Sequence, residues 1–261
     1  MSDEFGGPAV VLRKVDYGDS DAVVTFLSRD HGRVGAFVKG ARRRRNPRFL
    51  GALEPFTVLD ARFRRRSAGA NLVSLTVADV VEPHDRLRRD FQRIAWASYA
   101  AEVAREFAHE GEDAGVMYRI FTGYLGALSD PSPERGVRPE DQAAFELAAL
   151  AAAGFAPRLN GCGVCDRPLA PPPPPPVRWA LSQRAGGLLC ETCTAHDPPM
   201  SAGAAMSLRA VAGVIPPDLP SVRFDNPAIL ADLQGVLPDY IEAVLDKDLK
   251  TRAFLASTGL A

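Results

Sequence analysis

The chain has 261 residues, 46% of them hydrophobic and 24% charged, a composition typical of a globular protein with room for one to three domains. It contains no apolar run of the roughly 18 to 20 residues that a membrane helix needs, and its N-terminus, MSDEFGG, is acidic, so we expect a cytoplasmic protein without membrane contact. The formal net charge of −1 argues, by itself, against a protein that binds nucleic acid.

This average hides an uneven distribution of charge along the chain. Residues 1–93 carry 18 Lys and Arg against 12 Asp and Glu, whereas the remaining residues carry 13 against 20. Between Arg33 and Arg66 there are 11 basic residues and only two acidic ones, Glu54 and Asp60. The positive charge is therefore a local feature of the N-terminal part, and the acidic remainder is expected to face protein rather than nucleic acid.

Short β-rich runs separated by turn residues occupy the first third of the chain. Val, Phe, Leu and Thr are frequent in the runs, and Gly, Asp and Ser are frequent between them. The runs cover residues 9–15, 21–28, 33–39, 55–63 and 71–81. Five strands within about 75 residues predict a small β-barrel.

The run at 33–39 has the clearest period of two. Its alternation predicts that Val34, Ala36 and Val38 point into the core. Arg33, Phe37 and Lys39 are then expected on the opposite face. One face of this strand therefore carries positive charge together with an aromatic ring.

Helical periodicity begins after Pro83, where apolar residues recur every four positions. This stripe consists of Phe91, Ala95, Tyr99, Val103 and Phe107. It predicts an amphipathic helix.

Further helices are expected at residues 113–128 and 139–154, with Gly154 as a candidate C-cap. Asn226 followed by Pro227 is typical of a helix N-terminus and predicts a helical tail that runs toward Leu255. The C-terminal two-thirds is thus mainly helical, apart from residues 160–199, which lack any period and contain all four cysteines.

The cysteines form two CxxC pairs, Cys162 with Cys165 and Cys190 with Cys193. Two such pairs can direct four thiolates at one centre, the tetrahedral arrangement that Zn²⁺ prefers. Four thiolates leave no position for an activated water, so the expected zinc ion, one per chain, is structural. The alternatives are two disulfides, which fit poorly with a chain that lacks an export signal, or a redox CxxC motif, which normally starts a helix in a βαβ unit.

Two clusters of arginine suggest a nucleic-acid-binding surface. The first comprises Arg42, Arg43, Arg44, Arg45 and Arg48, and the second Arg62, Arg64, Arg65 and Arg66. Strand ends in a small barrel can bring both clusters to one rim, and Phe37 beside Arg33 and Lys39 would combine stacking with phosphate contact. The alternatives are a solvated loop for the arginines and a core position for Phe37. A third set, Arg86, Arg88, Arg89 and Arg93, either extends this surface or forms an ordinary solvent face.

Catalytic motifs are not evident in the sequence. It has no Gly-x-Ser-x-Gly motif, phosphate loop or His-Glu-x-x-His motif. Asp19, Asp21 and Asp30 could hold Mg²⁺ in a nuclease, although they are better explained as turn residues between strands. We therefore expect no enzyme activity.

Several sequence segments together resemble one protein family. These are VLRKVDYGDSDAVVTFLSRDHGRVGAFVKGARR from residue 11, GALEPFTVL from residue 51, the knuckles NGCGVC and AGGLLCETC, and LKTRAFL near the C-terminus. In this order they resemble RecO, the bacterial recombination mediator family, over nearly the whole chain.

The resemblance implies an α+β multidomain fold. Its parts would be an OB-fold DNA-binding domain at 1–81, a helical domain at 82–159, a zinc module at 160–199, and a C-terminal helical segment at 200–261 that packs with the helical domain. It places Lys39, Arg42 to Arg45 and Arg48 on the DNA surface of the OB-fold.

The activity that the resemblance implies is non-enzymatic. Such a protein binds single- and double-stranded DNA, anneals complementary strands and, with its partner RecR, helps RecA replace single-strand-binding protein, whose C-terminal tail it also contacts. A zinc-ribbon factor that acts on RNA or the ribosome is the main alternative, and a Mg²⁺-dependent nuclease is a second one.

Overall fold

The computed structural model describes residues 3–42, 49, 51–65, 72–132, 137–169, 178–194, 197–214 and 226–260. The chain divides into two compact units, Met1–Pro131 and Ser132–Ala261. No helix in the described ranges is both long enough and apolar enough to cross a membrane.

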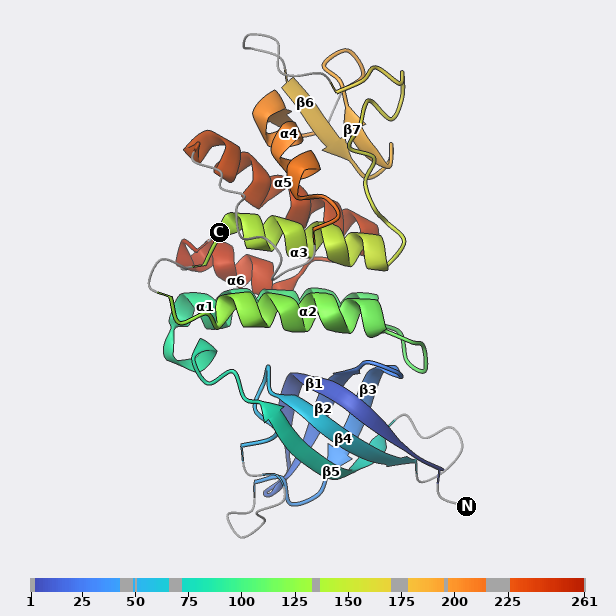
Figure 1. Cartoon of the computed structure of the whole chain (residues 1–261), viewed down its shortest axis with the longest axis vertical. Coiled ribbons are helices and arrows are strands. Elements are labelled where there is room, and N and C mark those ends of the chain that lie inside the picture. Colours follow the sequence, from blue (N-terminus) through green and yellow to red (C-terminus); the bar gives the residue numbers. More distant parts are fainter. Residues whose placement is uncertain are drawn as a thin grey trace. The chain divides into compact units, whose positions relative to one another are not determined.

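The first unit begins with a closed five-stranded barrel (Figure 1). Its strands are β1 (Asp3–Tyr17), β2 (Asp21–Ser28), β3 (Gly32–Val38), β4 (Val58–Arg65) and β5 (Val73–Glu82). They follow the order β1-β2-β3-β5-β4, in which β3 and β5 are parallel and every other neighbouring pair is antiparallel. The predicted OB-fold barrel is confirmed.

The barrel core is formed by the inward-facing residue of each alternating pair. In β3, Val34, Ala36 and Val38 are buried while Arg33 and Phe37 are only half-buried, as the period of two predicts. Across the interior, the rings of Phe26 and Phe63 meet edge to face with centroids 5.3 Å apart. Core residues therefore come from every strand, and the other face is left for solvent or ligands.

Among the described residues, a 3-10 helix and two α-helices follow the barrel in the first unit. The short 3-10 helix η2 (Leu87–Arg89) precedes α1 (Phe91–Phe107), and α2 (Gly115–Leu128) follows. The carboxylate of Asp90 caps α1 by accepting hydrogen bonds from the backbone N–H groups of Gln92 and Arg93. The predicted stripe is buried except at its first member, since Phe91 is 58% exposed.

Backbone hydrogen bonds join the barrel to the connection between α1 and α2. The backbone N–H of Arg33 donates to the carbonyl of His109, and the N–H of Gly111 donates to the carbonyl of His31. Gly32 sits between these contacts with a φ of +64°. A Cβ at this position would lie 1.9 Å from the His109 carbonyl oxygen, so only glycine fits.

In its described residues, the second unit combines four helices with a small three-stranded sheet. The helices are α3 (Pro139–Ala152), α4 (Ala202–Val211), α5 (Pro227–Leu245) and α6 (Lys250–Thr258). The sheet has the order β7-β6-β8, formed by β6 (Arg178–Ser182), β7 (Gly187–Leu189) and β8 (Pro199–Ser201). The helices α3, α4 and α5 pack on one another, and α4 and α5 also contact β6 and β8.

The predicted helical tail is two helices rather than one. Asn226 caps α5 as expected, but α5 ends at Leu245, and its C-cap residue, Asp246, adopts a left-handed conformation with a φ of +50°. Glu242 accepts a hydrogen bond from the backbone N–H of Leu249, the residue that precedes α6. Its carboxylate also forms an ion pair with Arg252. The C-cap of α3 is Ala153 rather than the expected Gly154, which follows it with a φ of +83°.

Candidate nucleic-acid interface and candidate metal centre

The strand register brings the two arginine-bearing strands onto either side of β5. Phe37 of β3 and Arg64 of β4 are both paired with Ser74 of β5. Neighbouring strands lie about 4.8 Å apart, so the backbones of these two residues are separated by only about 10 Å. The outward face of β3 and the outward face of the Arg64 strand therefore belong to one surface.

Several basic side chains on this surface already have partners within the barrel unit. Arg42 donates hydrogen bonds to Asp16 at 2.9 Å and to the Gly18 carbonyl at 2.7 Å. Arg64 donates through Nε to Glu4 at 2.7 Å. These ion pairs are exposed, so solvent screens them and phosphate groups can compete for the same guanidinium groups.

The remaining described candidates differ in their surroundings. Arg33 lies 3.8 Å from Glu110 and donates to the Arg105 carbonyl, and the guanidinium of Arg65 lies 5.9 Å from the centre of the Phe5 ring. Lys39 and Arg62 are exposed, and within the described ranges neither side chain forms an ion pair. An anionic ligand would therefore displace no ion-pair partner among the described residues from either of these two side chains.

Part of the predicted interface lies outside the described residues. This applies to Arg43, Arg44, Arg45, Arg48 and Arg66. Their assignment to the interface stays a prediction.

Two arginines of the third predicted set hold the first unit together. Arg88 donates to the carbonyls of Pro83 and Pro55 and to the Thr57 hydroxyl. Arg93 donates to the carbonyls of Leu128 and Asp130. Arg86 and Arg89 are exposed. The set is therefore divided between packing and the solvent face.

Two of the carboxylates considered for Mg²⁺, those of Asp21 and Asp30, are bonded to neighbouring groups of the barrel. Asp21 accepts a hydrogen bond from the backbone N–H of Gly40 at 2.8 Å. Asp30 pairs with Arg29, and this hydrogen bond lowers the pKa of the Asp30 carboxyl below its usual value. Among the described residues, the four cysteines are the one group of metal-ligating side chains that converges on a point.

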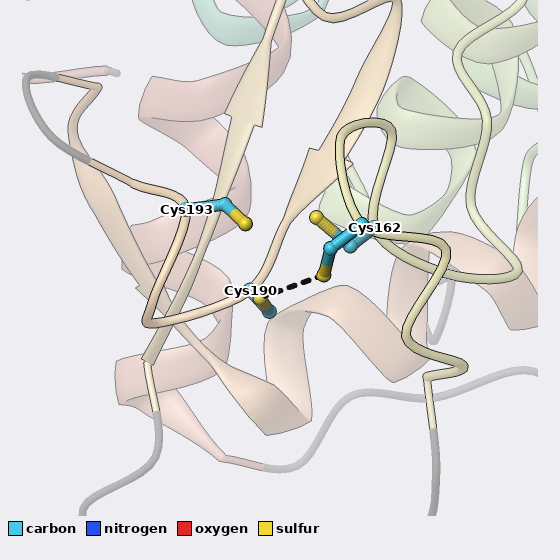
Figure 2. A group of neighbouring side chains, drawn as sticks. Cys162, Cys190 and Cys193 are labelled. Atoms are coloured by element: carbon cyan, nitrogen blue, oxygen red, sulfur yellow. Dashed lines mark hydrogen bonds between the residues drawn. The ribbon is translucent and has the colours of Figure 1, made fainter.

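The four cysteine thiols form a compact cluster in the second unit. Their Sγ atoms all lie within 4.8 Å of one another, and those of Cys165 and Cys190 are 3.6 Å apart. A tetrahedral zinc site with Zn–S bonds of about 2.3 Å requires Sγ–Sγ separations of about 3.8 Å. A disulfide requires about 2.05 Å, and all four cysteines are unbridged. Figure 2 shows the thiols of Cys162, Cys190 and Cys193 turned toward one another.

Local backbone turns position these thiols. The Cys162 carbonyl accepts a hydrogen bond from the N–H of Asp166, and the Cys190 carbonyl accepts two, from the N–H groups of Cys193 and Thr194. Gly163 permits close packing of the first turn, because a Cβ there would lie 2.6 Å from the Ala185 carbonyl oxygen. Each CxxC pair therefore folds back on itself and presents both sulfur atoms on one side.

The thiols differ in acidity because their neighbours differ. Burial disfavours the Cys190 thiolate, but hydrogen bonds from the Thr192 hydroxyl and backbone and from the neighbouring thiols outweigh it and lower its pKa to about 6. The thiols of Cys165 and Cys190 raise the pKa of Cys193 to about 12. A cation at the centre would stabilise all four thiolates at once, which fits a site built to hold a metal.

One residue of the barrel surface was missed by the sequence analysis. Tyr17, at the end of β1, is 60% exposed and its ring contacts Phe37. Sequence period and composition do not predict that Tyr17 lies on this surface, because its position in DYGDS is typical of the start of a turn. A register prediction for β1, β2 and β3 together would have placed it across β2 from the strand that carries Phe37.

Comparison with known proteins identifies related sequences along the whole chain. A family model described as "Recombination protein O N terminal" matches residues 1–84, and one described as "Recombination protein O C terminal" matches residues 88–253. The chain is 40% identical to the DNA repair protein RecO of Anaeromyxobacter dehalogenans (strain 2CP-C), over 96% of this chain and 95% of that protein. It is 35% identical to the DNA repair protein RecO of Myxococcus xanthus (strain DK1622), over 99% of both chains.

Proposed function

The chain belongs to the RecO family of DNA repair proteins, and from this premise we propose that it is a non-enzymatic recombination mediator that binds single- and double-stranded DNA through its barrel. The observation that carries the proposal is the shared pairing of Phe37 and Arg64 with Ser74, which supports one continuous surface that combines an aromatic ring with cations. The exposed Lys39 and Arg62 add charge that a phosphate can reach.

The proposed mechanism depends on the release of counterions. Each phosphate that a Lys or Arg neutralises displaces condensed cations from the DNA, so affinity falls as salt rises and depends little on sequence. Two strands held on one basic surface repel each other less, and base pairing then drives annealing. No step requires nucleotide hydrolysis.

The proposed partners follow from family membership. They are RecR, the C-terminal tail of single-strand-binding protein and, indirectly, RecA. The acidic composition of the chain after residue 93 supports contacts with protein rather than DNA there, since like charges repel the phosphate backbone.

We also propose that Cys162, Cys165, Cys190 and Cys193 hold one structural Zn²⁺. The compact arrangement of their sulfur atoms supports this. Bound zinc would supply a covalent crosslink between the two knuckles and no open coordination position, so it would stabilise the fold of residues 160–199 without taking part in chemistry.

The test of DNA binding removes charge from the arginine run 43–45. Changing Arg43, Arg44 and Arg45 to alanine in the full zinc-loaded chain is expected to weaken binding to oligonucleotides of any sequence and to reduce the salt slope by about 2, because each lost phosphate contact removes about 0.7 on a single strand. Fluorescence anisotropy over a range of salt concentrations measures both quantities.

A charge-matched control separates this effect from net charge. Arg119, Arg178 and Arg184 are exposed and lie outside the barrel, so changing them to alanine should leave the slope nearly unchanged. Equal effects of both triple variants would contradict the proposed interface. Preference for RNA over DNA of the same sequence would favour the ribosomal alternative, and degradation of labelled DNA on addition of Mg²⁺ would favour the nuclease.

A further inference from the structure

Two aromatic side chains meet on the outer face of the barrel. Tyr17 ends β1 and Phe37 lies in β3, and their ring centroids are 5.8 Å apart with an interplanar angle of 80°. Tyr17 is 60% exposed, whereas Phe37 is half-buried. An aromatic ring so exposed adds nothing to the barrel core, which is filled from the opposite face of the strands.

The register shows that this pair belongs to a larger apolar strip. Val15 of β1 is paired with Val23 of β2, and Val23 is paired with Phe37 of β3. Val15 is 43% exposed and Val23 is half-buried. Three strands therefore carry apolar side chains outward in one row, and Tyr17 stands at its end beside Phe37.

Cations lie at the same end of the strip. Lys39 follows Phe37 by two residues and is exposed. Arg42 is bound to Asp16 and to the Gly18 carbonyl, the residues on either side of Tyr17. Apolar rings next to basic side chains match a ligand that has both flat apolar faces and negative charge, which is the chemistry of a nucleic-acid strand.

We propose that Tyr17 and Phe37 form a stacking site for the unpaired bases of single-stranded DNA. The inference rests on the proposed DNA binding and adds to it a preference for single strands over duplex. Bases in a duplex are already stacked on their neighbours and cannot reach an aromatic ring, so this site selects single strands, while Lys39 and Arg42 contact the phosphates of either form.

The first test compares single strands with duplex. Tyr17→Ala in the full chain is expected to weaken binding to a single-stranded oligonucleotide by about tenfold and to change duplex binding by less than about twofold, because the loss is that of base stacking. Tyr17→Phe keeps the ring and should bind like the parent protein. Val81→Ala is the matched control, because Val81 is 66% exposed on β5 of the same barrel.

The second test removes the bases rather than the ring. The effect of Tyr17→Ala is expected to disappear on an abasic strand of the same length, and the salt slope should not change, because no charge has been removed. The fluorescence of a 2-aminopurine base in the strand should be quenched by the parent protein and quenched less by Tyr17→Ala. Thermal unfolding of each variant checks that a loss of folded protein does not cause the change.

The outcomes separate this inference from the proposed function. If the parent protein binds no DNA, the proposed function fails. A second case is a parent protein that binds DNA while Tyr17→Ala leaves the affinity for single strands intact, or weakens binding to single strands, duplex and abasic strands equally. Either result would contradict the stacking site alone. Unchanged DNA binding together with lost binding to RecR in a pull-down would identify this face as a protein interface and would also overturn the inference.

Discussion

The guanidinium of Arg42 donates a hydrogen bond of 2.9 Å to the carboxylate of Asp16, which ties the first residue of the arginine run to the end of β1. Both side chains are more than one-third exposed. Exposed ion pairs contribute little to stability, so this pair is better explained as a temporary partner for Arg42 than as part of the fold. The carboxylate then competes with DNA phosphate for the same guanidinium.

Removing this competition should strengthen DNA binding. Asp16→Asn removes the charged partner of Arg42, and we expect about threefold tighter binding to DNA at low salt, because an exposed ion pair contributes a few tenths of a kcal/mol to about 1 kcal/mol. Glu4→Gln should act similarly through Arg64. Anisotropy titrations of each variant measure the change.

The control is an acidic residue of the same barrel that forms no ion pair with a described arginine. Asp79 of β5 is exposed and, within the described residues, forms no ion pair, so Asp79→Asn changes net charge by the same amount without freeing a guanidinium. A gain in affinity from Asp79→Asn as large as that from Asp16→Asn would mean that only the general field matters.

The metal centre can be tested by composition and by rate of loss. We expect about one zinc per chain by elemental analysis, and none in Cys190→Ser, which should also lose solubility because the two knuckles are no longer joined. Thr192→Val removes a hydroxyl that shares a 3.1 Å hydrogen bond with the Cys190 sulfur. It should keep its zinc but release it to a chelator about tenfold faster. Stoichiometric disulfides without metal would show that the assignment is wrong.

Local patterns predicted most of the elements in this chain. The strands at 21–28 and 33–39 follow from a period of two between turn residues, and both are found. The two CxxC pairs predicted the sulfur cluster, because the four ligands come as two short-range pairs. In each case the signal lies within a few neighbouring residues.

Features that depend on distant pairing could not be predicted in this way. The insertion of β5 between β3 and β4 arises from contacts far apart in the sequence. The partners of Arg88 and Arg93 are backbone carbonyls such as those of Pro55 and Leu128, which carry no side-chain signal. The outward position of Tyr17 beside Phe37 likewise follows only from the register of three strands.

The junction between the barrel and the α1–α2 connection depends on the absence of a side chain at Gly32. Gly32→Ala should lower the free energy of unfolding by at least about 2 kcal/mol, because the new Cβ meets the His109 carbonyl and the backbone is held at a positive φ. Gly111→Ala is the control: Gly111 also has a positive φ, at +80°, but open space surrounds its Cβ position, so the cost should be about 1 kcal/mol. Urea unfolding measures both, and equal losses would contradict the steric explanation.

His84 makes the stability of the first unit depend on pH. It is 7% exposed, and its Nδ1 shares a 2.8 Å hydrogen bond with the Ser129 hydroxyl. Burial lowers the pKa of His84 below its ordinary value of 6.5, and Arg88 acts in the same direction while Glu82 opposes it. The folded protein therefore binds fewer protons at this site than the unfolded chain.

The sign of the effect follows from this difference. Above about pH 6.5 the imidazole of His84 is neutral in both states and does not change the free energy of unfolding. Below that pH the unfolded chain takes up a proton first, so the free energy of unfolding falls as the pH drops toward the folded pKa. We expect His84→Asn to show a smaller loss of stability between pH 7.5 and 5.5 than the parent; asparagine also tolerates the φ of +50° at this position. Urea unfolding followed by the fluorescence of Trp96, in a Trp179→Phe background, measures the first unit alone. Identical pH dependence in the two proteins would mean that His84 remains uncharged, or becomes charged, equally in the folded and unfolded states.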